Sequence, residues 1–305
     1  MNAHIELFLQ QVLNGLTIGM IYALIALGYT MVYGVLQLIN FAHGEIFMVG
    51  AHLALLMIWV LTSFFAGVPF WLVILGVFLF AMAGASFLGA AIEKTAYKPL
   101  RGSPKLTALI TSIGVSFFLQ NAVMLLCGSR EKTVPEVVPN LRFGLGAVSF
   151  SLVQLIIFLT SLGLMFFLTW FVKSTSLGRA MRATAENPEA ALLMGISVNR
   201  VIRVTFMLGS ALGAVAGALF AMYYGSINFH DGYLAGIKAF TAAVFGGIGS
   251  IPGAMLGGIL LGLFEGLAAG YISSEWKDAF AFLLLGAVLI FKPSGLFGEN
   301  LPEKV

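Results

Sequence analysis

The stretch LNGLTIGMIYALIALGYTMVYGVL, residues 13–36, contains no Asp, Glu, Lys, Arg or His. A helix needs about 20 mainly apolar residues to cross the roughly 30 Å hydrocarbon layer of a bilayer, so this stretch predicts a membrane-crossing helix. Around it, between Glu6 and Lys94, the only ionisable side chains of these kinds belong to four residues, His43, Glu45, His52 and Glu93. Further membrane segments are therefore expected throughout this region.

The composition of the whole chain supports the same class. The 305 residues are 60% hydrophobic and 10% charged, with a mean hydropathy of +1.00, whereas soluble domains carry about a quarter charged residues. A chain of this length with short connections has room for about eight to ten crossings. We expect an all-α, polytopic transmembrane helical bundle that forms a single transmembrane domain over residues 1–305, with discontinuous or re-entrant segments among its helices.

The small positive charge does not indicate a nucleic-acid partner. The net charge is +3 and the pI is about 9.0, but a membrane protein concentrates Lys and Arg in its cytoplasmic loops for topological reasons alone. The single cysteine, Cys127, cannot form a disulfide within the chain or supply a cysteine metal site. We expect neither nucleic-acid binding nor a bound metal.

Two basic segments predict the orientation in the membrane. The first, residues 93–105, carries four basic residues and two prolines, and the second, about residues 173–203, carries five basic residues against Glu186 and Glu189. Both are expected to be cytoplasmic under the positive-inside rule. Three crossings before the first basic segment would place the N-terminus outside and four would place it inside; the absence of early Lys and Arg favours outside.

Two series of glycines recur every four residues and so line one face of a helix. In lipid, helices associate through close backbone contact at small residues, and both series are therefore predicted to be helix-packing surfaces. Glu265 lies beside the second series, where we expect it to form a hydrogen bond between helices. The packing residues are Gly209, Gly213, Gly217, Gly258, Gly262, Gly266 and Gly270.

A polar motif interrupts the apolar N-terminal third. In Ile39-Asn40-Phe41-Ala42-His43-Gly44-Glu45 an amide, an imidazole and a carboxylate lie between apolar runs. A charge at a helix centre costs about 2.5–3.5 kcal/mol on insertion scales, and Gly44 would permit an interrupted helix. Asn40, His43, Gly44 and Glu45 are therefore candidates for the translocation path; the alternative is a short interfacial loop in which His43 and Glu45 are merely solvated.

The sequence of the glycine-rich region at residues 239–270 is compatible with three structures. The region could form one span, two short spans, or two half-helices that meet at residues 246–253, GGIGSIPG. A second short motif just before it, INFHDG at residues 227–232, resembles INFAHGE at residues 39–45. Internal repeats are common in transporters, but six residues with a shifted histidine are too few to establish one.

The second basic segment contains a predicted short helix. Asn187 suits an N-cap, Pro188 the first helical position and Gly195 the C-terminal stop, which predicts a two-turn helix over about 188–194. Its Leu192, Leu193 and Met194 are too apolar for a free loop, so either the chain's own loops or a groove on a soluble partner must cover them. The residues of this segment that could contact such a partner are Gly178, Arg179, Glu186, Asn187, Pro188, Glu189, Leu192, Leu193 and Gly195.

The sequence carries no recognisable motor or catalytic centre. It has no Gly-x-x-x-x-Gly-Lys-Ser/Thr phosphate loop and no arrangement of nucleophile, base or metal ligands that would support catalysis. We therefore expect a transport subunit rather than an enzyme, with energy from a partner or from ions. In the ion-coupled alternative, a secondary transporter or channel, Glu45 or Glu265 takes up a proton.

Several strings resemble the membrane permeases of bacterial branched-chain amino-acid ABC importers of the leucine/isoleucine/valine type. The resemblance covers nearly the whole chain and rests on residues 14–15, 22–34 and 39–45, on Gly178-Arg179-Ala180 and Gly195-Ile196, and on residues 238–244 and 246–254. It implies an inner-membrane subunit that pairs with a related permease, two cytoplasmic ATPases and a periplasmic binding protein. The resemblance further implies that ATP and Mg are used by the ATPases, that this chain binds no cofactor, and that residues 178–195 contact an ATPase. Relatives of this kind also serve other amino acids, amides or urea, so the substrate range stays open.

Overall fold

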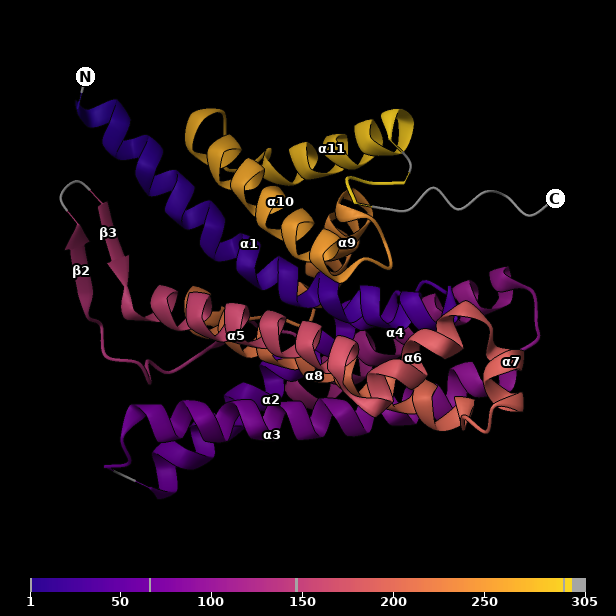
Figure 1. Cartoon of the computed structure of the whole chain (residues 1–305). Helices are drawn as coiled ribbons and strands as arrows, with labels where there is room; N and C mark the ends of the chain where they lie inside the picture. The colour runs from indigo at the N-terminus through magenta and orange to yellow at the C-terminus, as the bar shows by residue number, and fades with distance from the viewer. Residues whose placement is uncertain (1, 66, 146–147, 293, 298–305) are drawn as a thin grey trace.

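The computed structural model describes residues 2–65, 67–145, 148–292 and 294–297 and is dominated by long helices (Figure 1). Three precede the first basic segment, and α3 continues through a π-helical turn and a 3₁₀ turn. The helices are α1 (Asn2–Leu36), α2 (Ala42–Phe64), α3 (Phe70–Ile92), η1 (Glu93–Tyr97), η2 (Lys98–Leu100), α4 (Lys105–Cys127), α5 (Leu152–Ser174), α6 (Ser176–Glu186), α7 (Pro188–Leu193), α8 (Val198–Tyr224), α9 (Asp231–Gly246), α10 (Ile251–Tyr271) and α11 (Lys277–Phe291).

Seven helices are long and apolar enough to cross a membrane within the described ranges, namely α1, α2, α3 with its extension, α4, α5, α8 and α10. The predicted all-α polytopic bundle is confirmed, and the chain is a multi-pass membrane protein. Helices α9 and α11, with 16 and 15 residues, are shorter than a full crossing and pack beside α10. They are the kind of short segment that the sequence allowed for.

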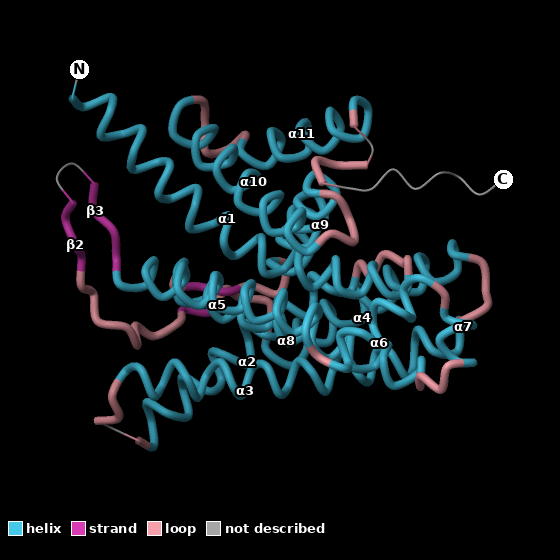
Figure 2. Tube along the Cα trace, in the orientation of Figure 1, coloured by secondary structure: helices cyan, strands magenta, loops and turns pink. Residues whose placement is uncertain are grey.

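The described residues also form four short strands in the connections between helices. Strand β1 (Lys132–Thr133) pairs antiparallel with β4 (Ser226–Ile227), and β2 (Arg142–Leu145) pairs with β3 (Val148–Ser151). Figure 2 shows the β2–β3 hairpin at the end of the bundle opposite α7. Ser151 ends β3 and, with Gln154, forms a capping box that starts α5 at Leu152.

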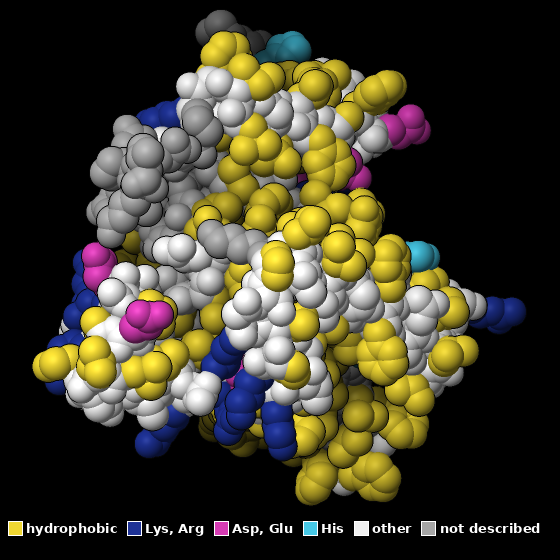
Figure 3. Space-filling view, turned by 90° about the vertical axis from the view of Figure 1, so that its right-hand side faces the viewer, with side chains coloured by type: hydrophobic (Ala, Val, Ile, Leu, Met, Phe, Trp, Pro, Cys, Tyr) yellow, Lys and Arg dark blue, Asp and Glu magenta, His cyan; other side chains and the backbone are white. Residues whose placement is uncertain are grey.

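Basic side chains gather at the other end. Figure 3 looks onto the face that carries α6 and α7, where Lys and Arg side chains are concentrated. Under the positive-inside rule we expect this end to be cytoplasmic and the hairpin end to be external. Because three spanning helices precede the first basic segment, the same rule predicts that the N-terminus of α1 lies on the external side.

The second basic segment is shorter than predicted. Helix α5 continues to Ser174 and α8 begins at Val198, so Arg200 and Arg203 lie on the first turns of α8 rather than in a loop. Arginine side chains at a helix end extend along apolar surface and keep their charge near water. The connection between the two long helices is therefore residues 175–197.

Helices α1 and α8 form the centre of the bundle, and both are largely buried, whereas α4 and α5 are mostly exposed to the surroundings. Small residues explain this arrangement. Gly258 lies against Ala23 of α1, Gly262 and Gly266 lie against Gly15, and Gly270 lies against Gln11. A Cβ added at Gly266 would be 2.6 Å from Cα of Gly15, so α1 and α10 pack at backbone contact.

The first glycine series packs α8 against two helices. Gly209 faces Gly28 of α1, while Gly213 faces His43 and Gly217 faces Ala51 of α2. A Cβ at Gly217 would lie 2.8 Å from the backbone nitrogen of Ala51. The backbone of α2 therefore packs directly against α8, and the ring of His43 lies next to Gly213.

The glycine-rich region folds as two helices with a break. Helix α9 ends at Gly246 and α10 begins at Ile251, and Gly247 and Gly249 have φ values of +106° and +95°, a left-handed region that favours glycine. Ser250 caps α10 by accepting a hydrogen bond from the backbone of Gly253 at 3.2 Å. The region is therefore not one span. Its break lies within residues 246–253, and it separates a short helix, α9, from a full-length helix, α10.

Candidate functional site

The polar motif lies inside the protein at the start of α2. Asn40, His43 and Glu45 are 2%, 1% and 1% exposed, so the alternative in which His43 and Glu45 are solvated is wrong. Ser116, which contacts Glu45, is the middle of the 23-residue helix α4, and Gly213, which faces His43, is the middle of α8. The start of α2 therefore lies deep in the membrane, and the connection at residues 37–41 is re-entrant.

Asn40 organises this connection. Its Oδ1 accepts hydrogen bonds from the backbone of Ala42 at 3.1 Å and from the hydroxyl of Tyr97 at 2.8 Å. The first bond satisfies a backbone donor at the start of α2 that has no partner within the helix. The second ties the re-entrant connection to the cytoplasmic end of α3. Gln37 adopts φ +52°, which turns the chain after α1.

His43 is enclosed by aromatic and glycine neighbours. Its ring contacts Tyr29 edge to face with ring centroids 4.8 Å apart, and Gly28 and Gly213 give it room on α1 and α8. Its Nε2 has no hydrogen-bond partner among the described residues. A buried polar atom without a hydrogen-bond partner costs free energy. This nitrogen is therefore available to bind water or a polar group of a ligand.

Glu45 is only partly satisfied. Its Oε1 accepts a hydrogen bond from Ser116 on α4 at 3.1 Å, and within the described chain its Oε2 has no partner. Gly232 and Gly236 of α9 pack against Gly44 and the Glu45 side chain. The two similar motifs thus meet, since α9 begins within INFHDG and α2 begins within INFAHGE.

A cavity of about 190 Å³ borders this polar cluster. Its walls are almost entirely aromatic and aliphatic, and the hydroxyl-bearing residue Ser116 joins it to Glu45. It lies where α1, α4, α9 and the re-entrant connection meet. The lining residues are Tyr29, Phe41, Ile113, Ser116, Phe117, Tyr233, Gly236 and Ile237. An apolar cavity with a few polar groups at its edge is typical of a small-molecule site.

The predicted coupling segment forms two helices, α6 and α7. Thr175 caps α6 by accepting a hydrogen bond from the backbone of Gly178 at 3.0 Å, and Asn187 caps α7 through bonds from Glu189 and Ala190, both at 3.0 Å. Pro188 opens α7 and Gly195, with φ +80°, follows it. The helix ends at Leu193, one residue before the predicted end.

The apolar residues of α7 point away from the chain. Leu192, Leu193 and Met194 are 58%, 89% and 82% exposed, whereas Ala191 on the opposite face is buried. Of the two ways to cover these residues, the chain's own described loops do not do so. The other predicted residues of the segment lie around this surface: Arg179 donates to the backbone carbonyl of Ser174 at 3.3 Å, and Glu186 ends α6.

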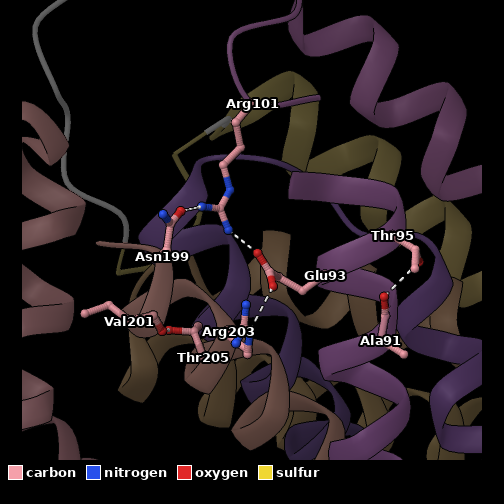
Figure 4. A network of polar contacts seen from close by, with 8 residues as sticks. All are labelled: Ala91, Glu93, Thr95, Arg101, Asn199, Val201, Arg203 and Thr205. Carbon is pink, nitrogen blue, oxygen red and sulfur yellow. Dashed lines mark hydrogen bonds and ion pairs between the residues drawn. The ribbon is translucent and has the colours of Figure 1, made fainter. Parts of the chain in front are cut away.

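An ion-pair cluster joins the cytoplasmic end of α3 to the first turns of α8, and the sequence did not reveal it. Figure 4 shows Glu93 between Arg101 and Arg203, with Arg101 also donating to Asn199. The carboxylate of Glu93 is 1% exposed. Burial lowers the pKa of Arg101 and the neighbouring Glu93 opposes that shift, and an arginine stays charged at neutral pH regardless.

Sequence reasoning assigned Glu93 to the start of a solvated basic loop. Its position could have indicated the ion pair, because Glu93 directly follows the apolar helix α3. A carboxylate buried at such a place needs a cationic partner. Through Tyr97 and Asn40 the cluster reaches the re-entrant connection. The first turns of α8, the end of α3 and the polar motif are thus joined by side-chain contacts.

Comparison with known proteins agrees with this architecture. Residues 11–289 match the family described as "Branched-chain amino acid transport system / permease component". The chain is 50% identical over 303 residues to the high-affinity branched-chain amino acid transport system permease protein BraD of Pseudomonas aeruginosa, with 98% of each chain covered.

Two further relatives extend the comparison. The LivH permease protein of the high-affinity branched-chain amino acid transport system of Escherichia coli K12 is 46% identical, again with 98% of each chain covered. A probable branched-chain amino acid transport permease protein LivH of Methanocaldococcus jannaschii is 28% identical over 91% of this chain and 88% of that protein. With its apolar cavity, re-entrant polar motif and full-length matches, the chain belongs to the family of permease components of branched-chain amino acid transport systems.

Proposed function

We propose that this chain is the transmembrane permease subunit of an ATP-driven importer that moves branched-chain amino acids across a bacterial inner membrane. The family and the full-length relatives support the substrate class. The observation that carries the mechanism is α7, whose Leu192, Leu193 and Met194 are exposed at the basic end of the bundle. A free apolar surface of this kind favours a protein partner.

The partner that fits α7 is a cytoplasmic ATPase. The sequence has no phosphate loop of its own, so separate subunits must hydrolyse ATP with the help of Mg. The proposed assembly contains two such ATPase subunits. A second permease subunit and a periplasmic amino-acid-binding protein complete it. The ATPases move α6 and α7, which pack against α8, and the Glu93 cluster ties α8 to the end of α3, so that the two helices move together.

Asn40, His43, Gly44 and Glu45 form part of the translocation path in this proposal. They adjoin an apolar cavity that suits a branched aliphatic side chain, and the unpartnered atoms of His43 and Glu45 offer polar contacts during passage. Substrate crosses without chemical change. The bundle alternates between outward-open and inward-open states around this region.

An ion-coupled transporter is the second candidate. It is favoured by Glu45 Oε2, a carboxylate oxygen buried at mid-membrane without a partner among the described residues. A carboxylate in this setting is a candidate proton carrier. In that mechanism uptake would need a proton gradient and no ATPase.

Reconstitution separates the two mechanisms. The purified permease with its ATPase and permease partners is placed in proteoliposomes, and uptake of labelled leucine is followed with and without ATP and the binding protein. The importer predicts uptake only when both are present. Uptake by this chain alone that follows a proton gradient and ignores ATP would contradict the proposal.

A further inference from the structure

A second cavity lies in the external half of the bundle, away from the polar motif of α2. Its volume is about 150 Å³, and it lies between α1, the end of α8, and α9, α10 and α11. Tyr224 ends α8 at the external side, and Lys277 begins α11 there. The walls contain five charged residues, Asp231, Lys238, Glu265, Lys277 and Asp278.

The ammonium group of Lys238 contacts two carboxylates and a tyrosine hydroxyl within the protein. Its Nζ donates to Glu265 at 2.8 Å and to the hydroxyl of Tyr22 at 3.2 Å, and it forms an ion pair with Asp278 at 2.5 Å. The two hydrogen bonds use two of the three N–H donors of a lysine ammonium, while Oδ1 of Asp278 pairs with its charge but has no hydrogen-bond partner among the described residues. The sequence predicted that Glu265 takes part in a hydrogen bond between helices, and in the structure Glu265 on α10 accepts one from Lys238 on α9.

Negative charge remains after this pairing. Two carboxylates share the one ammonium of Lys238, and Oε2 of Glu265 has no hydrogen-bond partner in the described part of the chain although the residue is 3% exposed. A buried carboxylate oxygen of this kind is costly unless a donor approaches it. The cavity wall therefore offers a place for a second cation.

A second positive charge lines the same cavity. Lys277 makes no ion pair with any described residue. Its ammonium is thus available to an anion, and the cavity lining also includes the apolar residues Phe220, Leu234 and Ala235. The cavity combines a site for a cation, a site for an anion and an apolar wall.

We infer that this cavity is a binding site for the zwitterionic backbone of an aliphatic amino acid on the external side of the permease. The substrate ammonium binds Glu265 and Asp278, its carboxylate binds Lys277, and its side chain lies against Phe220 and Leu234. The inference rests on the proposed function for the class of substrate. It adds a site, distinct from the mid-membrane cavity, where the permease itself receives the amino acid before it passes inward.

The test measures ligand binding by the assembled permease complex in detergent without the binding protein. The unfolding temperature is recorded with millimolar leucine, with leucinamide, which lacks the carboxylate, and with isocaproate, which lacks the ammonium. A site that needs both charges predicts that leucine raises the unfolding temperature more than either analogue. No shift with leucine, or equal shifts with all three compounds, would overturn the inference.

Lys277→Gln is the decisive variant, because the described residues give it no structural partner whose loss would unfold the protein. A hydrogen bond to a charged group is worth about 1.5–3 kcal/mol, which corresponds to roughly tenfold or more in leucine affinity. Lys292→Gln, at the other end of α11, is the matched control and should bind leucine as the unchanged protein does. Unchanged leucine affinity in Lys277→Gln would also overturn the inference.

The two proposals fail in distinguishable ways. If ATP-dependent leucine uptake by the complete importer is observed but leucine affinity does not depend on Lys277, only the external site is wrong. If uptake itself does not depend on ATP, the importer is wrong. Glu265→Gln serves as a second variant, and loss of the leucine shift in a folded Glu265→Gln complex would support the ammonium contact.

Discussion

Replacing Leu193 by Asp should detach the ATPase from the permease without unfolding the permease. Leu193 is 89% exposed, so nearly its whole side chain is available to a partner. Full burial of a leucine contributes about 1.5–3 kcal/mol, and each 1.4 kcal/mol is a factor of ten in affinity. The dissociation constant for the ATPase should rise by at least roughly tenfold, and a carboxylate forced into an apolar groove adds to that loss.

The assay is quantitative binding of purified ATPase to the permease in lipid nanodiscs, together with the unfolding temperature of each variant. Leu193→Ala removes the apolar contact without adding a charge and should lose less affinity than Leu193→Asp. Leu141→Asp is the control, since Leu141 is 52% exposed near the β2–β3 hairpin at the opposite end. ATPase binding that is the same for Leu193→Asp and the unchanged protein would refute α7 as the docking helix.

Three further predictions address the path, the packing and the helix cap. Glu45→Gln should reduce uptake in proteoliposomes while the complex still assembles; normal uptake kinetics would make Glu45 structural. Gly262→Ala should lower the free energy of unfolding of the permease by about 1–3 kcal/mol, because the added Cβ meets the backbone of α1. Gly286→Ala is the control, since Gly286 has open space around it. Equal unfolding temperatures for the two variants would contradict the close packing of α1 and α10. Asn187→Ala should cost α7 about 0.5–2 kcal/mol of helix stability, seen as weaker ATPase binding, and full binding would argue against the cap.

The membrane class and several local features were predictable because they depend on residues near one another in the chain. The apolar stretch at residues 13–36 predicted a spanning helix, and α1 covers it. The short helix α7 was predicted within one residue from Asn187, Pro188 and Gly195, since caps act within a single turn. The glycines at intervals of four indicated the faces on which α8 and α10 pack, because that interval is a property of the helix itself.

The depth of the polar motif could not be predicted, because it depends on where α1 ends and how α2 re-enters. The sequence left open whether His43 and Glu45 were buried or solvated, and only the packing of α2 against α4 and α8 buries them. The extent of the second basic segment was also misjudged. Arg200 and Arg203 were read as loop residues, but α8 begins before them.

Sequence alone determined that this protein is a bundle of membrane helices with a short apolar helix at its basic end. Hydrophobicity, charge distribution and helix capping depend on residues that are close together in the sequence, so they can be judged without the tertiary structure. Tertiary structure alone decided which distant charges meet: Glu93 with Arg203, and Lys238 with Glu265 and Asp278. These partners come from helices far apart in the chain, and burial of a charge in a low-dielectric interior requires a partner without specifying which residue supplies it.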